Sequence, residues 1–138
     1  MLKPGVTVIA VDDQRDVFLT EEFHYGVGRT TIEGVSGGVE PGEEPLVTAR
    51  RELREEIGIE AGQWDHLGTT DPFTAGTVSL TQLYLARKLS FVADAPEGTE
   101  IIRRIQIPLA EAVEMVLASK ITHSPSCLAI LMAWQRLQ

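Results

Sequence analysis

Residues 37–59 read GGVEPGEEPLVTARRELREEIGI, and this stretch decides the fold more than any other part of the chain. Pro45 suits the first turn of a helix, and Gly58 supplies a stop signal thirteen residues later. Between them, apolar residues recur at the three- and four-residue spacing of one helix face: Leu46, Ala49, Leu53 and Ile57. The stretch therefore predicts a helix over residues 45–57, entered through a glycine-rich turn.

The same stretch gathers acidic residues. Residues 40–60 hold seven glutamates and three arginines, a local balance of −4 within a total charge of −8. Glu52, Glu55 and Glu56 are spaced three and four apart, so their carboxylates project from one helix face and repel one another unless cations are present. Two interpretations stay open from these residues alone. One is a solvated face with Glu/Arg pairs. The other is a site for a hard divalent cation such as Mg²⁺ or Mn²⁺, since a cluster of glutamates without His or Cys argues against structural zinc.

The rest of the chain predicts a mixed α/β fold, a sheet sandwiched between helices, in one domain spanning residues 1–138. Two apolar runs suggest an opening hairpin over residues 6–11 and 17–20, followed by a glycine-interrupted strand over 32–39. Further strands are expected at 64–70, 77–87 and 101–107, a loop at 93–99, and helices at 109–119 and 126–137.

Composition excludes several classes of function. With 12 Lys and Arg against 20 Asp and Glu, the chain does not suit a nucleic-acid backbone. It has no apolar run of membrane-spanning length and residues 1–11 lack the pattern of a signal peptide, so we expect a cytoplasmic protein. The lone Cys127 is expected to pack as a small buried hydrophobe, and Trp64 and Trp134 as packing residues. The three histidines are expected to be surface or structural residues: His24, His66 and His123.

Residues 37–59 resemble the Nudix box, Gly-x5-Glu-x7-Arg-Glu-U-x-Glu-Glu-x-Gly-U, where U is a bulky aliphatic residue. Every fixed position matches: Gly37, Glu43, Arg51, Glu52, Leu53, Glu55, Glu56, Gly58 and Ile59. The resemblance implies the Nudix fold, a mixed sheet between helices with a loop–helix–loop metal site, and hydrolysis of a nucleoside diphosphate linked to another moiety. It implies Mg²⁺ or Mn²⁺ as cofactor. The implied metal ligands are Glu52, Glu55, Glu56 and the carbonyl of Ser36, with Glu43 and Arg51 as the pair that orients the site.

The flanking segments resemble the ADP-ribose and ADP-sugar pyrophosphatase branch of that family, which implies AMP and a sugar phosphate as products and a homodimer as the assembly. The resemblance implies a catalytic base at Glu100, with Glu97 as its substitute, and substrate contacts at Glu22, His24, Pro72 and Phe73. We also expect Tyr25 and Phe73 to be able to stack on a base.

The chain departs from the branch in two ways. His24 stands where the branch usually has Arg, and the chain begins almost at the first core strand, without the N-terminal extension that long members exchange between subunits. These departures leave three alternatives open: another nucleoside diphosphate sugar as substrate, a nucleoside triphosphate, or a domain that senses a nucleotide without hydrolysing it.

Overall fold

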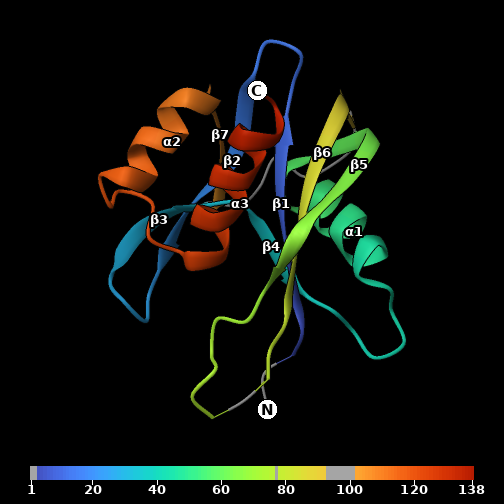
Figure 1. Cartoon of the computed structure of the whole chain (residues 1–138), viewed down its shortest axis with the longest axis vertical. Helices are drawn as coiled ribbons and strands as arrows, with labels where there is room; N and C mark the ends of the chain where they lie inside the picture. Colours follow the sequence, from blue (N-terminus) through green and yellow to red (C-terminus); the bar gives the residue numbers. More distant parts are fainter. Residues whose placement is uncertain (1–2, 77, 93–101) are drawn as a thin grey trace.

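The computed structural model describes residues 3–76, 78–92 and 102–138 (Figure 1). In chain order the elements are β1 (Gly5–Val11), β2 (Asp16–His24), β3 (Arg29–Glu33), β4 (Val35–Gly38), α1 (Pro45–Ile57), β5 (Ile59–Thr70), β6 (Thr81–Phe91), β7 (Ile102–Pro108), α2 (Leu109–Leu117) and α3 (Ser124–Arg136). No helix in these ranges is long and apolar enough to cross a membrane.

The strands form one mixed sheet with the order β3-β2-β1-β6-β5, in which β4 also pairs with β1 and β7 with β2. β1 and β6 run parallel, and the other pairs are antiparallel. β1 lies at the centre because its β-branched, apolar residues are buried on both faces.

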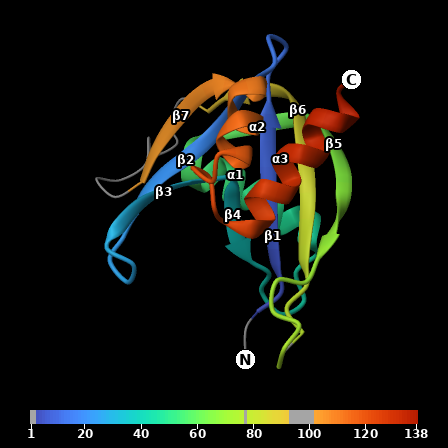
Figure 2. The ribbon, with the colours of Figure 1, turned by 60° about the vertical axis from the view of Figure 1, so that its left-hand side comes forward.

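Helices cover both faces of this sheet, as the sequence predicts. Ile9 and Val11 of β1 pack into a core with α2 and α3, whereas Val6, Val8 and Ala10 pack into a second core with α1. Figure 2 shows α3 crossing in front of β1 and β6, with α1 behind the sheet. The mixed sheet between helices is therefore confirmed.

Helix α1 has the bounds that the sequence predicts. Pro45 begins it, and Gly58 ends it in a left-handed conformation with φ of 68°, donating its backbone N–H to the carbonyls of the last turn. Ala49, Leu53 and Ile57 are fully buried, so the apolar stripe anchors the helix to the sheet and leaves the glutamates on its flank.

The prediction of one strand over residues 32–39 is wrong. The chain makes two strands there, with β3 pairing β2 and β4 pairing β1, and it changes partner at Gly34. A Cβ at Gly34 would lie 2.9 Å from Ile9 Cδ1 and 3.1 Å from the Val8 carbonyl, so only glycine permits this close crossing over β1.

Other bounds also differ from those predicted. β2 continues to His24, and β5 begins at Ile59 rather than at residue 64, directly after α1. These extensions carry polar residues without a clean alternation, which explains why the apolar pattern does not reveal them. The last helices span Leu109–Leu117 and Ser124–Arg136.

Candidate active site

The three box glutamates project from α1 beside the sheet, with unequal burial. The side chain of Glu55 is 61% exposed, whereas that of Glu52 is only 17% exposed. Oε2 of Glu56 is buried and has no hydrogen-bond partner within the described residues. A buried carboxylate oxygen without a donor is costly, so this atom calls for a partner that the described residues do not supply.

Glu43 and Arg51 form the pair that the resemblance implies. Arg51 donates from Nε to Oε2 of Glu43 at 3.2 Å and from Nη2 to Oε1 at 3.0 Å, a two-point contact that fixes the guanidinium. Thr48 donates a further hydrogen bond to Glu43 at 2.6 Å. Arg51, followed by Thr48, lowers the pKa of Glu43 to about 2, so this carboxylate stays ionised at any working pH.

Arg51 also positions Glu52, the first of the three box glutamates on α1. Its Nη1 donates to Oε1 of Glu52 at 2.8 Å and lies 3.6 Å from Oε2 of Glu55. On the other side, a Cβ at Gly37 would lie 2.5 Å from Cδ of Glu52, so the carboxylate rests against the bare backbone of β4. Ser36 precedes Gly37 in β4, which brings its backbone next to the same carboxylate.

Repulsion and burial act together on Glu56. Burial, followed by the charge of Glu52, raises the pKa of Glu56 to about 8. Glu22 and Glu33 add smaller repulsions, which means that both lie within electrostatic reach of α1. An arrangement that penalises an ionised carboxylate in this way suits a bound cation, because a cation inverts the local electrostatics.

The donor set fits a hard divalent cation, although the side chains are not yet gathered round one point. The candidate ligands on α1 and β4 are all oxygens, which Mg²⁺ and Mn²⁺ prefer. Across residues 3–76, 78–92 and 102–138, no three His, Cys, Asp or Glu side chains are already grouped to hold a metal ion.

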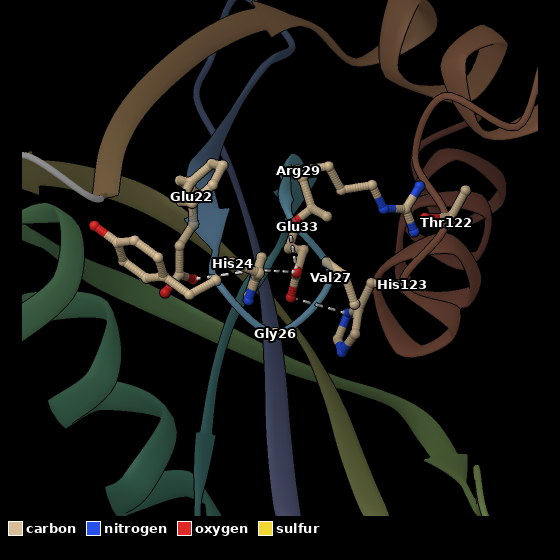
Figure 3. Close-up of a pocket in the computed structure, with 11 residues that line it drawn as sticks. Glu22, His24, Gly26, Val27, Arg29, Glu33, Thr122 and His123 are labelled. Atoms are coloured by element: carbon tan, nitrogen blue, oxygen red, sulfur yellow. Dashed lines mark hydrogen bonds and ion pairs between the residues drawn. The ribbon is translucent and has the colours of Figure 1, made fainter.

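A pocket of about 560 Å³ opens between the β2–β3 hairpin and the start of α3 (Figure 3). Glu22 and His24 line it, and their roles as substrate contacts stay predictions. Glu33 and His123 line it as well, together with Arg29 and Tyr25. Tyr25 is 79% exposed and packs edge-on against Phe23, so an aromatic pair flanks the pocket.

Hydrogen bonds tie the walls of this pocket together. His24 Nε2 lies 3.1 Å from Oε2 of Glu33, and Thr31 donates to the same oxygen at 2.7 Å. The buried hydroxyl of Ser126 accepts the backbone N–H of Gly34 at 2.8 Å and lies 2.7 Å from His123 Nδ1. The start of α3 is thereby attached to the turn between β3 and β4.

The structure brings together only part of the predicted site. Arg51 contacts Glu43, Glu52 and Glu55, and the charge of Glu22 reaches Glu56. Glu22 and His24 line the pocket, and Ser36 lies in β4 next to Gly37. Pro72 and Phe73 lie in the loop between β5 and β6 and are not among the residues that line the pocket. Phe73 is 53% exposed, so its stacking role stays a prediction. Glu97 and Glu100 fall outside the described residues.

Sequence reasoning missed Glu33 and His123. Glu33 directly precedes the glycine at which the chain changes strand partner, and His123 directly precedes α3. The sequence predicts one strand over residues 32–39 and so does not mark Glu33 as the end of an element. Nothing in the sequence indicates that Glu33 and His123, 90 residues apart, line one pocket. The other expectations about packing hold: Trp64 and Trp134 pack partly buried against the two cores, and Cys127 is partly buried against the carbonyl of Ile121.

The mixed sheet between helices and the glutamate-lined helix α1 after a glycine-rich turn agree with the resemblance to Nudix hydrolases. Comparisons with known proteins identify the family. The NUDIX domain family matches residues 1–123. A methanol dehydrogenase activator of Bacillus methanolicus is 30% identical over 130 residues, which cover 92% of this chain and 70% of that protein.

Two further comparisons agree. An ADP-ribose pyrophosphatase of Bacillus subtilis is 28% identical over 130 residues, again covering 92% of this chain and 70% of that protein. A solved structure described as an ADP compounds hydrolase superposes with a TM-score of 0.81 at 20% identity, covering 99% of this chain and 74% of that one, and so supports the fold. The chain belongs to the NUDIX domain family and is a Nudix pyrophosphohydrolase. Members of this family generally use divalent metal ions.

Proposed function

We propose that this protein is an Mg²⁺- or Mn²⁺-dependent hydrolase of a nucleoside diphosphate-linked compound, with ADP-ribose or an ADP-sugar as substrate and AMP and a sugar phosphate as products. The observation that carries the proposal is the buried Oε2 of Glu56, which has no partner among the described residues. Glu22 and Glu33, which repel Glu56, line a pocket of about 560 Å³ that has room for a sugar or a base. The likeness to an ADP-ribose pyrophosphatase supports the choice of substrate.

In this proposal Glu52, Glu55, Glu56 and the carbonyl of Ser36 hold the cation. When bound, the cation neutralises phosphate oxygens and lowers the pKa of a coordinated water. Arg51, fixed by Glu43, keeps Glu52 aligned, because a ligand held at a second point loses less rotational freedom on binding. Glu56 supplies negative charge from a partly water-excluded position.

Around the diphosphate, Glu22 and His24 contact the moiety that lies in the pocket, while Glu100, or Glu97 in its place, accepts the proton of the attacking water. Pro72 and Phe73 complete the substrate contacts from the β5–β6 loop. His24 offers one ring nitrogen to a ligand, where an arginine would offer a two-point contact. We therefore expect weaker binding of this part of the substrate.

The test compares wild type with Glu56→Gln on ADP-ribose, ADP-glucose, ATP and diadenosine polyphosphates in the presence of Mg²⁺ or Mn²⁺, with products resolved by mass. Glu114→Gln, on the exposed side of α2, is the matched control. We expect AMP and ribose 5-phosphate from wild type and from the control, and a loss of at least 100-fold in kcat for Glu56→Gln. Full turnover by Glu56→Gln would show that the box is not the active site. Absence of hydrolysis by wild type on every compound would favour a sensing domain.

We further propose a homodimer, which the resemblance implies. Tyr25, Val27 and Val78 are all more than 60% exposed and supply apolar surface for a partner copy. Light scattering coupled to gel filtration tests this, and a mass of 15.1 kDa at 100 µM would contradict it.

A further inference from the structure

Glu33 occupies the wall of the pocket at the end of β3, with a side chain only 16% exposed. One of its oxygens, Oε2, is already engaged by Thr31 at 2.7 Å and by His24 at 3.1 Å. Because an ionised carboxylate only accepts hydrogen bonds, Thr31 donates its hydroxyl proton and His24 donates from Nε2. The carboxylate is therefore held in one orientation from two strands.

The other oxygen, Oε1, keeps its accepting capacity. His123 Nδ1 lies 3.6 Å from Oε1, too far for a hydrogen bond, and no donor in the described part of the chain forms a hydrogen bond with this oxygen. His123 Nδ1 instead lies 2.7 Å from Ser126 Oγ, whose hydroxyl can donate to it while accepting from Gly34. Burial lowers the pKa of His123, so the ring is neutral near pH 7 and offers Glu33 no charge.

Charge decides what kind of group can approach this oxygen. Glu22 lines the same pocket, and Glu22 and Glu33 both act electrostatically on Glu56. A further phosphate placed here would meet two carboxylates, whereas a hydroxyl or an N–H group would gain a charge-assisted hydrogen bond. Figure 3 shows the guanidinium of Arg29, another residue that lines the pocket, pointing toward Thr122.

We propose that Glu33 is a specificity-determining residue whose Oε1 accepts a hydrogen bond from an uncharged donor, a sugar hydroxyl or a base N–H, on the substrate moiety beyond the diphosphate. This inference rests on the proposed function and names what the pocket selects: a diphosphate joined to a neutral, donor-bearing group rather than a longer polyphosphate. A site that reads a donor in this way rejects ligands that lack it, because the buried acceptor is then left unpaired.

The test measures KM and kcat of Glu33→Gln with ADP-ribose, its 2′- and 2″-deoxy analogues, IDP-ribose and ATP. Glu21→Gln is the matched control, since Glu21 lies on β2 in contact with Arg103 and is not among the residues lining the pocket. We expect KM for ADP-ribose to rise 10- to 100-fold in Glu33→Gln, with kcat changed less than about threefold and Mn²⁺ affinity unchanged. We also expect the kcat/KM for ATP, relative to that for ADP-ribose, to be at least tenfold higher in Glu33→Gln than in wild type.

The analogues identify the donor. Wild type should lose at least tenfold in kcat/KM on the one analogue that lacks the recognised group, and Glu33→Gln should not distinguish that analogue from ADP-ribose. A loss on a deoxy analogue assigns a sugar hydroxyl, and a loss on IDP-ribose assigns the base amine. If Glu33→Gln is unstable, Glu33→Asp repeats the comparison with the charge retained and the oxygen withdrawn by one methylene.

Two kinds of failure are distinguishable. Wild type that hydrolyses no compound refutes the proposed function. Wild type that hydrolyses ADP-ribose, with both Glu33 variants showing its KM and its selectivity, refutes the role of Glu33 alone. A fall in kcat and Mn²⁺ affinity without a change in KM would also overturn the inference, because it would place Glu33 among the groups that support the metal.

Discussion

Replacing Gly37 with alanine tests whether the approach of β4 to α1 sets the geometry of the metal site. The new Cβ would lie 2.5 Å from both Cγ and Cδ of Glu52, where ordinary contact begins at 3.4 Å. The Glu52 carboxylate would therefore have to retreat by about 0.9 Å. The backbone itself permits alanine, since Gly37 is not among the residues with positive φ.

The size of the effect follows from that displacement. Misplacing a reacting or ligating group by about 1 Å costs roughly 100-fold in rate, and overpacking costs about 1–3 kcal/mol of stability. Because Glu52 is a flexible side chain at the edge of the core, we expect the loss of stability to lie at the lower end of this range, about 1 kcal/mol. The predicted result is a loss of about 100-fold in kcat and of roughly tenfold in Mn²⁺ affinity in a folded protein.

Three measurements check this: kcat with ADP-ribose, Mn²⁺ affinity by calorimetric titration, and the free energy of unfolding in urea. Gly38→Ala is the matched control, because its Cβ meets only the Lys3 side chain, with the nearest atom, Cδ, at 3.2 Å, which can move aside. If Gly37→Ala hydrolyses ADP-ribose and binds Mn²⁺ as Gly38→Ala does, the close contact with Glu52 has no role in the site.

Three further predictions follow from the same geometry. In EDTA, the free energy of unfolding of Glu56→Gln in urea should match that of wild type at pH 4.5 and exceed it by about 2 kcal/mol at pH 8. The pKa of Glu56 is about 8 in the folded protein against 4.5 ordinarily, so wild type loses stability as the pH rises between these values. The full shift corresponds to about 5 kcal/mol, and the smaller figure allows for the partial exposure of Glu56 and its interaction with Glu52. Arg51→Lys should lower kcat 10- to 100-fold, since an ammonium cannot hold Glu43 at two points, and an unchanged kcat would exclude an orienting role. Ser126→Ala should cost about 1–3 kcal/mol by leaving the Gly34 N–H without its acceptor, whereas the exposed Ser124→Ala should stay within about 0.5 kcal/mol of wild type in thermal unfolding.

The parts of the site that sequence could predict are those that lie close together in the chain. Helix α1 follows from local signals, a proline at its start, a glycine at its end and an apolar stripe between them. The shared face of Glu52, Glu55 and Glu56 follows from helical spacing, because these residues belong to one helix. The pairing of Glu43 with Arg51 across eight residues was implied by the resemblance to the Nudix box.

The break at Gly34 lies beyond such reasoning. The apolar pattern of residues 32–39 is compatible with one strand, and only the close passage over Ile9 and Val8 divides it. That division has a functional consequence, because it ends β3 at Glu33 and directs this side chain toward His24 and His123. A change of strand partner depends on tertiary packing, and the pocket wall depends on that change.

The same distinction applies to the charge of the site. Within residues 40–60, several glutamates are neutralised by neighbours, since Arg51 holds Glu43 and Glu52 and Arg54 pairs with Glu60. Glu56 has a buried oxygen without a hydrogen-bond partner among the described residues. Its pKa is raised first by burial, then by the charge of Glu52, with smaller repulsions from Glu22 on β2 and Glu33 on β3. Sheet topology therefore adds to the repulsion that the box glutamates create. Glu22 and Glu33 also line the pocket, so in our proposal the same two carboxylates favour a cation at α1 and an uncharged moiety in the pocket.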